Sequence, residues 1–221
     1  MCGRFNLLVD AQSVADLYDV TVTQLAPRYN IAPTQPVAAV RINEAGNREF
    51  THFYWGLIPS WSKDPSFGAR MINARSETAH EKPSFRSAFK RRRCVIPASG
   101  FYEWQKTASG KQPMHIHHKN NETLSLGGLW EYWADAQGNE IESCTILTCA
   151  PNAFMSPLHN RMPVILETAD LELWLDHSAP LPAVQSLMKP AQEYVLTAYP
   201  VSTFVNKAGN DSAECIARIY L

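Results

Sequence analysis

The alternation of apolar and polar residues along the chain predicts many short strands and a few short helices. Runs that alternate, or stay apolar between turn residues, predict strands at 36–42, 49–55, 94–97, 102–105, 114–118, 123–127, 142–149 and 194–200. Apolar residues at helical spacing predict helices at 10–18, 83–91 and 183–188, and a fourth helix that Thr168 caps. The pattern indicates an α+β fold with a curved, mostly antiparallel, barrel-like β-sheet core and a few short flanking helices.

Composition narrows the class of protein. The chain has 221 residues, of which 45% are hydrophobic and 19% charged, as in an ordinary globular protein. It shows no internal repeat, low-complexity tract or linker, so we expect residues 1–221 to form a single domain. No stretch approaches the roughly 20 apolar residues that span a bilayer, and the N-terminus lacks the apolar region of a signal peptide. We therefore expect a cytoplasmic monomer without a membrane partner.

The cysteines and histidines favour neither a disulfide framework nor a metal site. The five cysteines are odd in number and contain no CxxC pair, which favours a reducing compartment. His115 and His117 would share one face of a strand, but no carboxylate or cysteine lies at ligand spacing from them. We therefore expect no metal and no cofactor.

Charge is distributed unevenly along the chain. The net charge is −1, yet residues 70–93 carry eight basic and two acidic side chains. Such a basic segment can draw a polyanion to one face of an otherwise near-neutral protein. An alternative is a solvated basic turn without a partner, and charge alone does not decide between the two.

Cys2 is the residue best suited to carry chemistry, as an N-terminal nucleophile once Met1 is removed. Removal would leave an α-amine whose reference pKa is about 7.7–8.0, so a sizeable fraction is unprotonated near neutral pH. Such an amine forms imines readily, and the neighbouring thiol can close a five-membered ring on the imine carbon. An aldehyde is the natural electrophile for this aminothiol, and Arg4 adds a phosphate-capable side chain nearby. The alternative is a small residue that packs in the core.

Three polar side chains lie in segments rich in aromatic or loop residues. Asn73 is a neutral hydrogen-bond partner, and Arg75 beside it is a candidate phosphate clamp. Glu103 lies between two aromatic residues that would raise the pKa of its carboxyl and so suit it to act as a general acid. His159 is suited to proton transfer near pH 7. Each has a structural alternative, a paired carboxylate for Glu103 and a packed imidazole for His159. Trp61 is a candidate base-stacking platform.

Seven motifs in order along the chain resemble the SRAP family, proteins named as SOS-response-associated peptidases. They are MCGRF up to residue 5, RYNIAPTQ at 28–35, WGLIPSW at 55–61, NARSET at 73–78, RRCVIPASGFYEW at 92–104, SPLHNRMPVIL at 156–166 and VSTFVN at 201–206. One departure is Ser99, where many members have aspartate; a serine hydroxyl can still support the turn, although more weakly.

The resemblance implies a protein that processes abasic sites in single-stranded DNA during the DNA damage response, associated with the nucleoid. It implies that Cys2 closes a thiazolidine crosslink with the abasic sugar, with AP lyase activity and self-reversal as further reactions. Asn73, Glu103 and His159 match the other active-site positions of the family. The residues that match DNA-binding positions are Arg4, Trp61, Arg75 and Arg161.

Three other functions remain open from the sequence. An N-terminal-nucleophile amidohydrolase would use the thiol of Cys2 on an amide, with the α-amine as base. A cysteine peptidase could remove its own first residues, as the family name suggests. A non-covalent single-stranded DNA-binding module would need no nucleophile.

Overall fold

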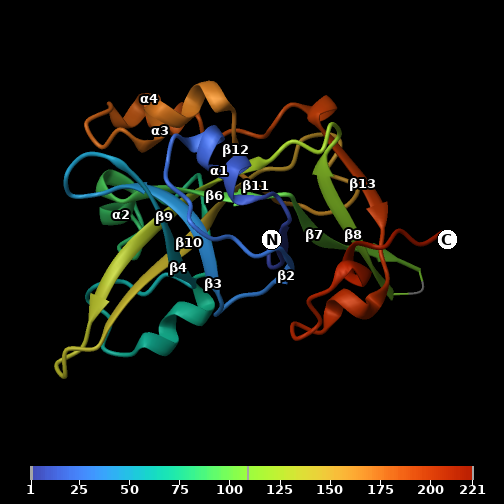
Figure 1. Ribbon diagram of the computed structural model, residues 1–221, viewed down its shortest axis with the longest axis horizontal. Coiled ribbons are helices and arrows are strands. Elements are labelled where there is room, and N and C mark those ends of the chain that lie inside the picture. Colours follow the sequence, from blue (N-terminus) through green and yellow to red (C-terminus); the bar gives the residue numbers. More distant parts are fainter. Residues whose placement is uncertain (1, 109, 221) are drawn as a thin grey trace.

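Two β-sheets form the framework of the protein, seen in a computed structural model that describes residues 2–108 and 110–220 (Figure 1). The smaller sheet is antiparallel throughout and has the strand order β13-β8-β7-β1-β2. Its strands are β1 (Phe5–Leu7), β2 (Arg28–Ile31), β7 (Gly100–Thr107), β8 (Gly110–His118) and β13 (Leu196–Pro200).

The larger sheet closes into a barrel. Its order is β11-β10-β4-β3-β6-β9-β12, and β9 also pairs with β10, so that five of its strands form a ring. The β10–β4 and β10–β5 pairings are parallel, and the other described pairings of this sheet are antiparallel. The strands are β3 (Pro36–Ile42), β4 (Arg48–Trp55), β5 (Asn73–Arg75), β6 (Arg93–Ala98), β9 (Leu124–Ala134), β10 (Glu140–Cys149), β11 (Met162–Pro163) and β12 (Ile165–Leu166).

Short helices cover the outside of this framework. The α-helices are α1 (Ala11–Tyr18), α2 (Arg86–Arg91), α3 (Leu171–Leu175) and α4 (Leu181–Ser186), and α3 and α4 lie together at the top of Figure 1. The 3-10 helices are η1 (Pro65–Arg70), η2 (Thr168–Asp170), η3 (Glu193–Val195), η4 (Thr203–Asn206) and η5 (Ala213–Ile216). The predicted α+β class, with its mostly antiparallel, barrel-like core and short helices, is confirmed.

The predicted helices differ from the structure in three details, of which the first is that the helix expected at 183–188 begins and ends two residues earlier, as α4. Thr168 does not cap a helix, because residues 168–170 form η2 before α3 begins, and neither turn has a side-chain cap. Residues 83–85 form a turn, so α2 begins at Arg86 and Pro83 lies outside it. Helix α1, by contrast, has a full N-cap, since the Asp10 carboxylate accepts a hydrogen bond of 2.8 Å from the Ser13 amide.

One large core cluster joins the two sheets and contains the N-terminus of the described chain. Phe5 on β1 packs edge-on against Trp55 on β4, with ring centroids 5.2 Å apart. Cys2 is fully buried in the same cluster. Because β1 pairs with β7 on one side and packs on the barrel, the chain start is held at the junction of both sheets.

Part of the basic segment 70–93 serves the fold. Arg93 is completely buried, and its guanidinium donates hydrogen bonds to the backbone carbonyls of Trp174, at 2.6 Å, and Phe89, at 2.7 Å. Arg92 lies 2.7 Å from the buried carboxylate of Glu131. These two arginines do not present a free charge to a polyanion, so the basic face is smaller than the sequence indicates.

None of the helices in the described part of the chain has both the length and the apolar character needed to cross a bilayer. Within residues 2–108 and 110–220, no three His, Cys, Asp or Glu side chains gather where a metal ion could be held. All five cysteines are buried free thiols.

Candidate active site

Asn73 fixes the backbone of Cys2. Its side-chain Nδ2 donates a hydrogen bond of 2.9 Å to the carbonyl oxygen of Cys2. Asn73 is the first residue of β5, which pairs in parallel with β10 through Ile146, so a strand of the barrel holds the amide in place. The structure thus joins two residues that lie 71 positions apart in the sequence.

A carboxyl group and an imidazole meet beside Cys2. Glu103 lies on β7 and is only 3% exposed, and His159, in the loop between β10 and β11, places Nε2 at 3.8 Å from its Oε2. Burial raises the pKa of the Glu103 carboxyl, and the charge of His159 opposes that shift. A carboxyl with a raised pKa can hold a proton closer to neutral pH, which general acid catalysis requires.

Backbone contacts orient the His159 ring. The Arg161 amide donates to Nδ1 at 3.1 Å, and the His159 amide donates to the Met155 carbonyl at 2.9 Å. Nδ1 also lies 3.2 Å from the Arg161 carbonyl oxygen, so it can accept from the amide or donate to the carbonyl, and in either case Nε2 is the nitrogen that faces Glu103. The pair is therefore arranged to pass a proton between imidazole and carboxyl.

The Cys2 thiol is held in its neutral form. Burial, followed by the negative charge of Glu103, raises the pKa of this thiol to about 12. Reactive cysteine hydrolases depend on the opposite condition, a thiolate stabilised by a cation or a helix N-terminus. The surroundings of Cys2 therefore do not favour attack by a preformed thiolate.

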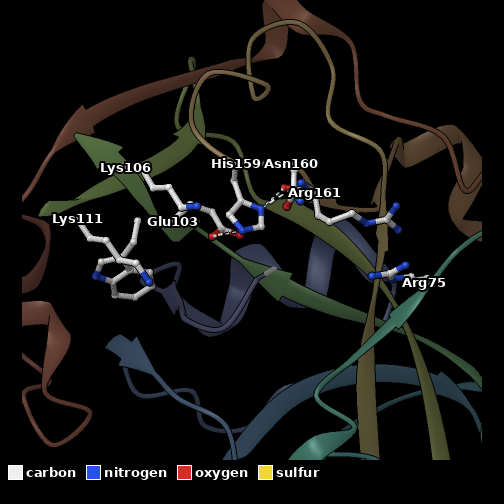
Figure 2. Close-up of a pocket in the computed structure, with 8 residues that line it drawn as sticks. Arg75, Glu103, Lys106, Lys111, His159, Asn160 and Arg161 are labelled. Atoms are coloured by element: carbon white, nitrogen blue, oxygen red, sulfur yellow. Dashed lines mark hydrogen bonds and ion pairs between the residues drawn. The ribbon is translucent and has the colours of Figure 1, made fainter. Parts of the chain in front are cut away.

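A cavity of about 660 Å³ opens above Glu103 and His159. Figure 2 shows the Glu103–His159 pair in the middle of this cavity, with lysines at one end and arginines at the other. Its lining residues are Arg75, Glu103, Trp104, Lys106, Lys111, His159, Asn160 and Arg161. Four of these side chains are cationic, so the cavity is suited to an anionic or polyanionic ligand.

The two arginines of the cavity differ in what holds them. Arg161 forms a two-pronged ion pair with Glu77, at 2.6 and 2.8 Å, and also donates to the backbone carbonyl of Thr148. Arg75 is exposed at the end of β5. Arg75 can therefore reach a phosphate directly, whereas Arg161 would have to share its charge with Glu77.

Arg4 and Trp61 do not line this cavity. Arg4 donates hydrogen bonds of 2.8 Å to both the Asn30 side chain and the Val205 carbonyl. Its guanidinium lies 5.9 Å from the centroid of the Trp104 ring. Trp61 is 59% exposed and packs edge-on against Phe67, with ring centroids 5.9 Å apart. A DNA contact for either residue stays a prediction, and Arg4 in addition ties the C-terminal segment to β1 and β2.

The sequence reasoning missed several residues of the cavity. They are Lys106, Lys111 and Asn160, together with Glu77, which neutralises Arg161. A hairpin was the available signal, because two consecutive antiparallel strands bring the residues at their facing ends, here Lys106 and Lys111, opposite each other. No local pattern points to the Glu77–Arg161 pair, because the two residues are 84 positions apart.

Residues 1–208 match the family described as SOS response associated peptidase (SRAP). The chain belongs to the SRAP family. It is 41% identical over 222 residues to the abasic site processing protein YoaM of Bacillus subtilis, covering 98% of this chain and 97% of that protein. It is 34% identical to the abasic site processing protein HMCES of Gallus gallus, covering 88% of this chain and 67% of that protein.

The SRAP fold recurs in solved structures. A crystal structure of a protein from Bacteroides thetaiotaomicron is similar to this chain with a TM-score of 0.89 and 27% sequence identity. The match covers 99% of this chain and all of the other. The family that the seven motifs resemble is therefore confirmed.

Proposed function

We propose that this protein processes abasic sites in single-stranded DNA by trapping the sugar aldehyde on Cys2. The observation that carries the proposal is the buried Glu103, whose charge raises the pKa of the Cys2 thiol and which lies 3.8 Å from His159 in the lining of a cationic cavity. SRAP relatives named as abasic site processing proteins, at 34–41% identity, support it. Met1 lies outside the described residues, and its removal stays part of the proposal.

The reaction begins at the α-amine that removal of Met1 frees on Cys2. The amine nitrogen attacks the aldehyde carbon of the ring-opened sugar, and the resulting carbinolamine loses one water molecule to become an imine. The thiol sulfur then bonds to the imine carbon, and the thiol proton passes by way of Glu103 to the nitrogen. The product is a thiazolidine, formed with the net loss of one water and no oxidant.

Three side chains serve this sequence of steps. Glu103, kept protonatable by burial, donates a proton to the departing hydroxyl and accepts the thiol proton. His159, with Nε2 at 3.8 Å, exchanges protons between Glu103 and the cavity. Asn73 holds the Cys2 backbone through its 2.9 Å hydrogen bond and so fixes the direction of the nucleophile.

The neutral thiol favours this reading over a cysteine amidohydrolase or peptidase. Burial and the charge of Glu103 raise the pKa of the Cys2 thiol, and a neutral thiol is a weak nucleophile toward an amide near neutral pH. It can still close on an imine, because that attack is intramolecular and the amine has already made the carbon electrophilic. The imine is also the point at which strand cleavage of the lyase type, and reversal of the crosslink, would branch off.

A denaturing gel tests the proposal. Purified protein is mixed with single-stranded DNA that carries one abasic site, and intact mass identifies the N-terminus and any adduct. We expect a heat-stable adduct weighing one water less than protein plus DNA, absent for Cys2→Ala and for protein that retains a residue before Cys2. Correctly processed protein that forms no adduct would exclude the proposal. Binding unaffected by Cys2→Ala, without an adduct, would leave a non-covalent binding module.

A further inference from the structure

Two lysines face each other at the tip of the β7–β8 hairpin. Lys106 on β7 and Lys111 on β8 are directly paired in the antiparallel register, and both are exposed. Side chains directly opposite in such a pair have Cβ atoms about 4.5–5.5 Å apart, and like charges there destabilise the sheet. Within residues 2–108 and 110–220 neither lysine forms an ion pair with a carboxylate. An anion between the two ammonium groups would relieve this repulsion.

The lysine pair lines the same cavity as the proposed catalytic residues. Figure 2 shows it at the end opposite Arg75, with Glu103 and His159 between. Lys106 follows Glu103 by three residues on one strand, which is about 10 Å at the rise of a β-strand. The pair is therefore placed to reach a neighbouring nucleotide rather than the reacting sugar.

Contacts at the base of the hairpin fix its position. The Trp104 indole donates a hydrogen bond of 2.7 Å to the Asn206 side chain. The Gln105 side chain donates to the Pro157 carbonyl at 3.3 Å, in the loop that carries His159. The lysine pair is thus tied, through its own strand, to the same loop that holds His159.

We propose that Lys106 and Lys111 form a phosphate subsite for the DNA strand, on the opposite side of the abasic nucleotide from Arg75. This rests on the proposed function, since it names how the same cavity holds its substrate. A phosphodiester oxygen accepts hydrogen bonds from both ammonium groups, and each lysine acts as a compact positive charge. The strand would cross the cavity with phosphates held at both ends and the sugar over Glu103 and His159.

Salt dependence tests the number of phosphates held. Binding of undamaged single-stranded DNA is measured over a range of salt for wild type and for Lys106→Gln/Lys111→Gln. The matched control is Lys119→Gln/Lys189→Gln, which removes the same charge from two exposed lysines outside the cavity. Each lost phosphate contact lowers the salt slope by about 0.7 for a single strand. We expect Lys106→Gln/Lys111→Gln to lose about one phosphate contact more than the control variant. Equal salt slopes for the two variants would overturn the proposal.

Neutral backbone linkages locate the subsite. Single methylphosphonates are placed, one at a time, on either side of the abasic site in oligonucleotides that carry a stable abasic analogue. We expect a methylphosphonate at one or two positions to weaken DNA binding by wild type but not by Lys106→Gln/Lys111→Gln, which shows that the lysines contact the phosphate at that position. The same comparison with Arg75→Gln should identify positions on the other side of the abasic site. No coupled position, or coupling on the same side as Arg75, would overturn the proposal.

The crosslinking assay separates this subsite from the function on which it rests. One outcome is that wild type forms the adduct while Lys106→Gln/Lys111→Gln has the same salt slope and the same response to methylphosphonates as the control variant. In that case the phosphate subsite is excluded and the proposed function stands. If wild type binds DNA with coupled lysines but forms no adduct, the function fails. Circular dichroism of the exposed lysine variants checks that each remains folded.

Discussion

Nε2 of His159 lies 3.8 Å from Oε2 of Glu103, while Nδ1 of the same ring accepts the Arg161 backbone amide. The two contacts give the imidazole ring a defined orientation, with Nε2 facing the buried carboxyl of Glu103. Glu103 in turn raises the pKa of the Cys2 thiol through its charge, after burial itself. A proton that moves between His159 and Glu103 changes the charge of Glu103, and therefore the pKa and the nucleophilicity of the Cys2 thiol.

Glu103→Gln should slow crosslinking without weakening binding of undamaged DNA. Glutamine keeps the shape of the side chain but cannot exchange a proton, and general acid–base catalysis contributes about 10²–10⁴-fold to a rate. We expect a loss within that range in the single-turnover rate of adduct formation. The pH–rate profile of the variant should lack the ionisation that wild type owes to Glu103. An unchanged rate and profile would assign the carboxyl a structural role only.

The same substitution should stabilise the protein increasingly as pH rises. Because the pKa of Glu103 is higher in the folded than in the unfolded chain, the folded state binds its proton more tightly. Its contribution is therefore most favourable below the unfolded pKa and is lost as pH rises through the folded pKa. We expect the melting temperature of Glu103→Gln minus that of wild type to increase as pH rises above the ordinary pKa of a Glu carboxyl, which is about 4.3.

Glu77→Gln is the control with the opposite sign. Its hydrogen bond with Arg161 lowers the pKa of Glu77, so its contribution is present above the unfolded pKa and is lost as pH falls. The pair is partly exposed, so we expect only a small loss of stability near neutral pH, which disappears in acid. Two variants with the same trend in pH would contradict the assignment for Glu103.

Asn73→Ala should reduce the rate of the chemical step more than DNA binding. The Asn73 amide contacts the Cys2 carbonyl at 2.9 Å and is absent from the cavity lining, so its removal misdirects the nucleophile without removing a cation. We expect a single-turnover rate at saturating DNA that is lower by about 10-fold or more, with an unchanged Kd. Asn73→Asp, which cannot donate to the carbonyl, should behave in the same way; equal losses in Kd and rate would argue for a binding role.

The strands that the sequence predicted are those with a long alternating pattern. Strand β3 has the predicted bounds. Strand β7 extends past its predicted end because its pairing with β8 continues through the polar Lys106 and Thr107. Strand β9 extends through residues 128–134, which pair with β10. Strands β1, β2 and β5 have three or four residues each and were not predicted, since so few residues show no period. Yet β1 and β5 are the strands next to Cys2 and at Asn73.

Within the site, the sequence predicted which residue types would be present more easily than it predicted which residues would contact one another. The carboxylate between two aromatic residues indicated the buried Glu103. The basic segment indicated a charged surface, but the sequence did not distinguish Arg93, which is wholly buried, from Arg75, which is exposed. Both are arginines in a polar stretch, and only the pairing of β6 in the barrel places Arg93 against α3, where it is buried. Partners such as Asn30 for Arg4 depend on tertiary structure alone.

Arg4→Ala should lower the stability of the fold, whatever its effect on DNA. Its guanidinium contacts Asn30 and the Val205 carbonyl at 2.8 Å each, and Asn30 itself donates to the carbonyls of Val205, Lys207 and Asn210. Hydrogen bonds to charged groups contribute about 1.5–3 kcal/mol, and about 1 kcal/mol corresponds to 2–4 °C in a chain of this size. We expect the Tm to fall by roughly 4–10 °C. The backbone amides of residues 205–210 should exchange their hydrogens with solvent faster.

Arg75→Ala, which removes an exposed charge, should weaken DNA binding with little change in Tm. If Arg4→Ala instead left the Tm intact and weakened only DNA binding, the Arg4 guanidinium would act on phosphate rather than on the C-terminal segment.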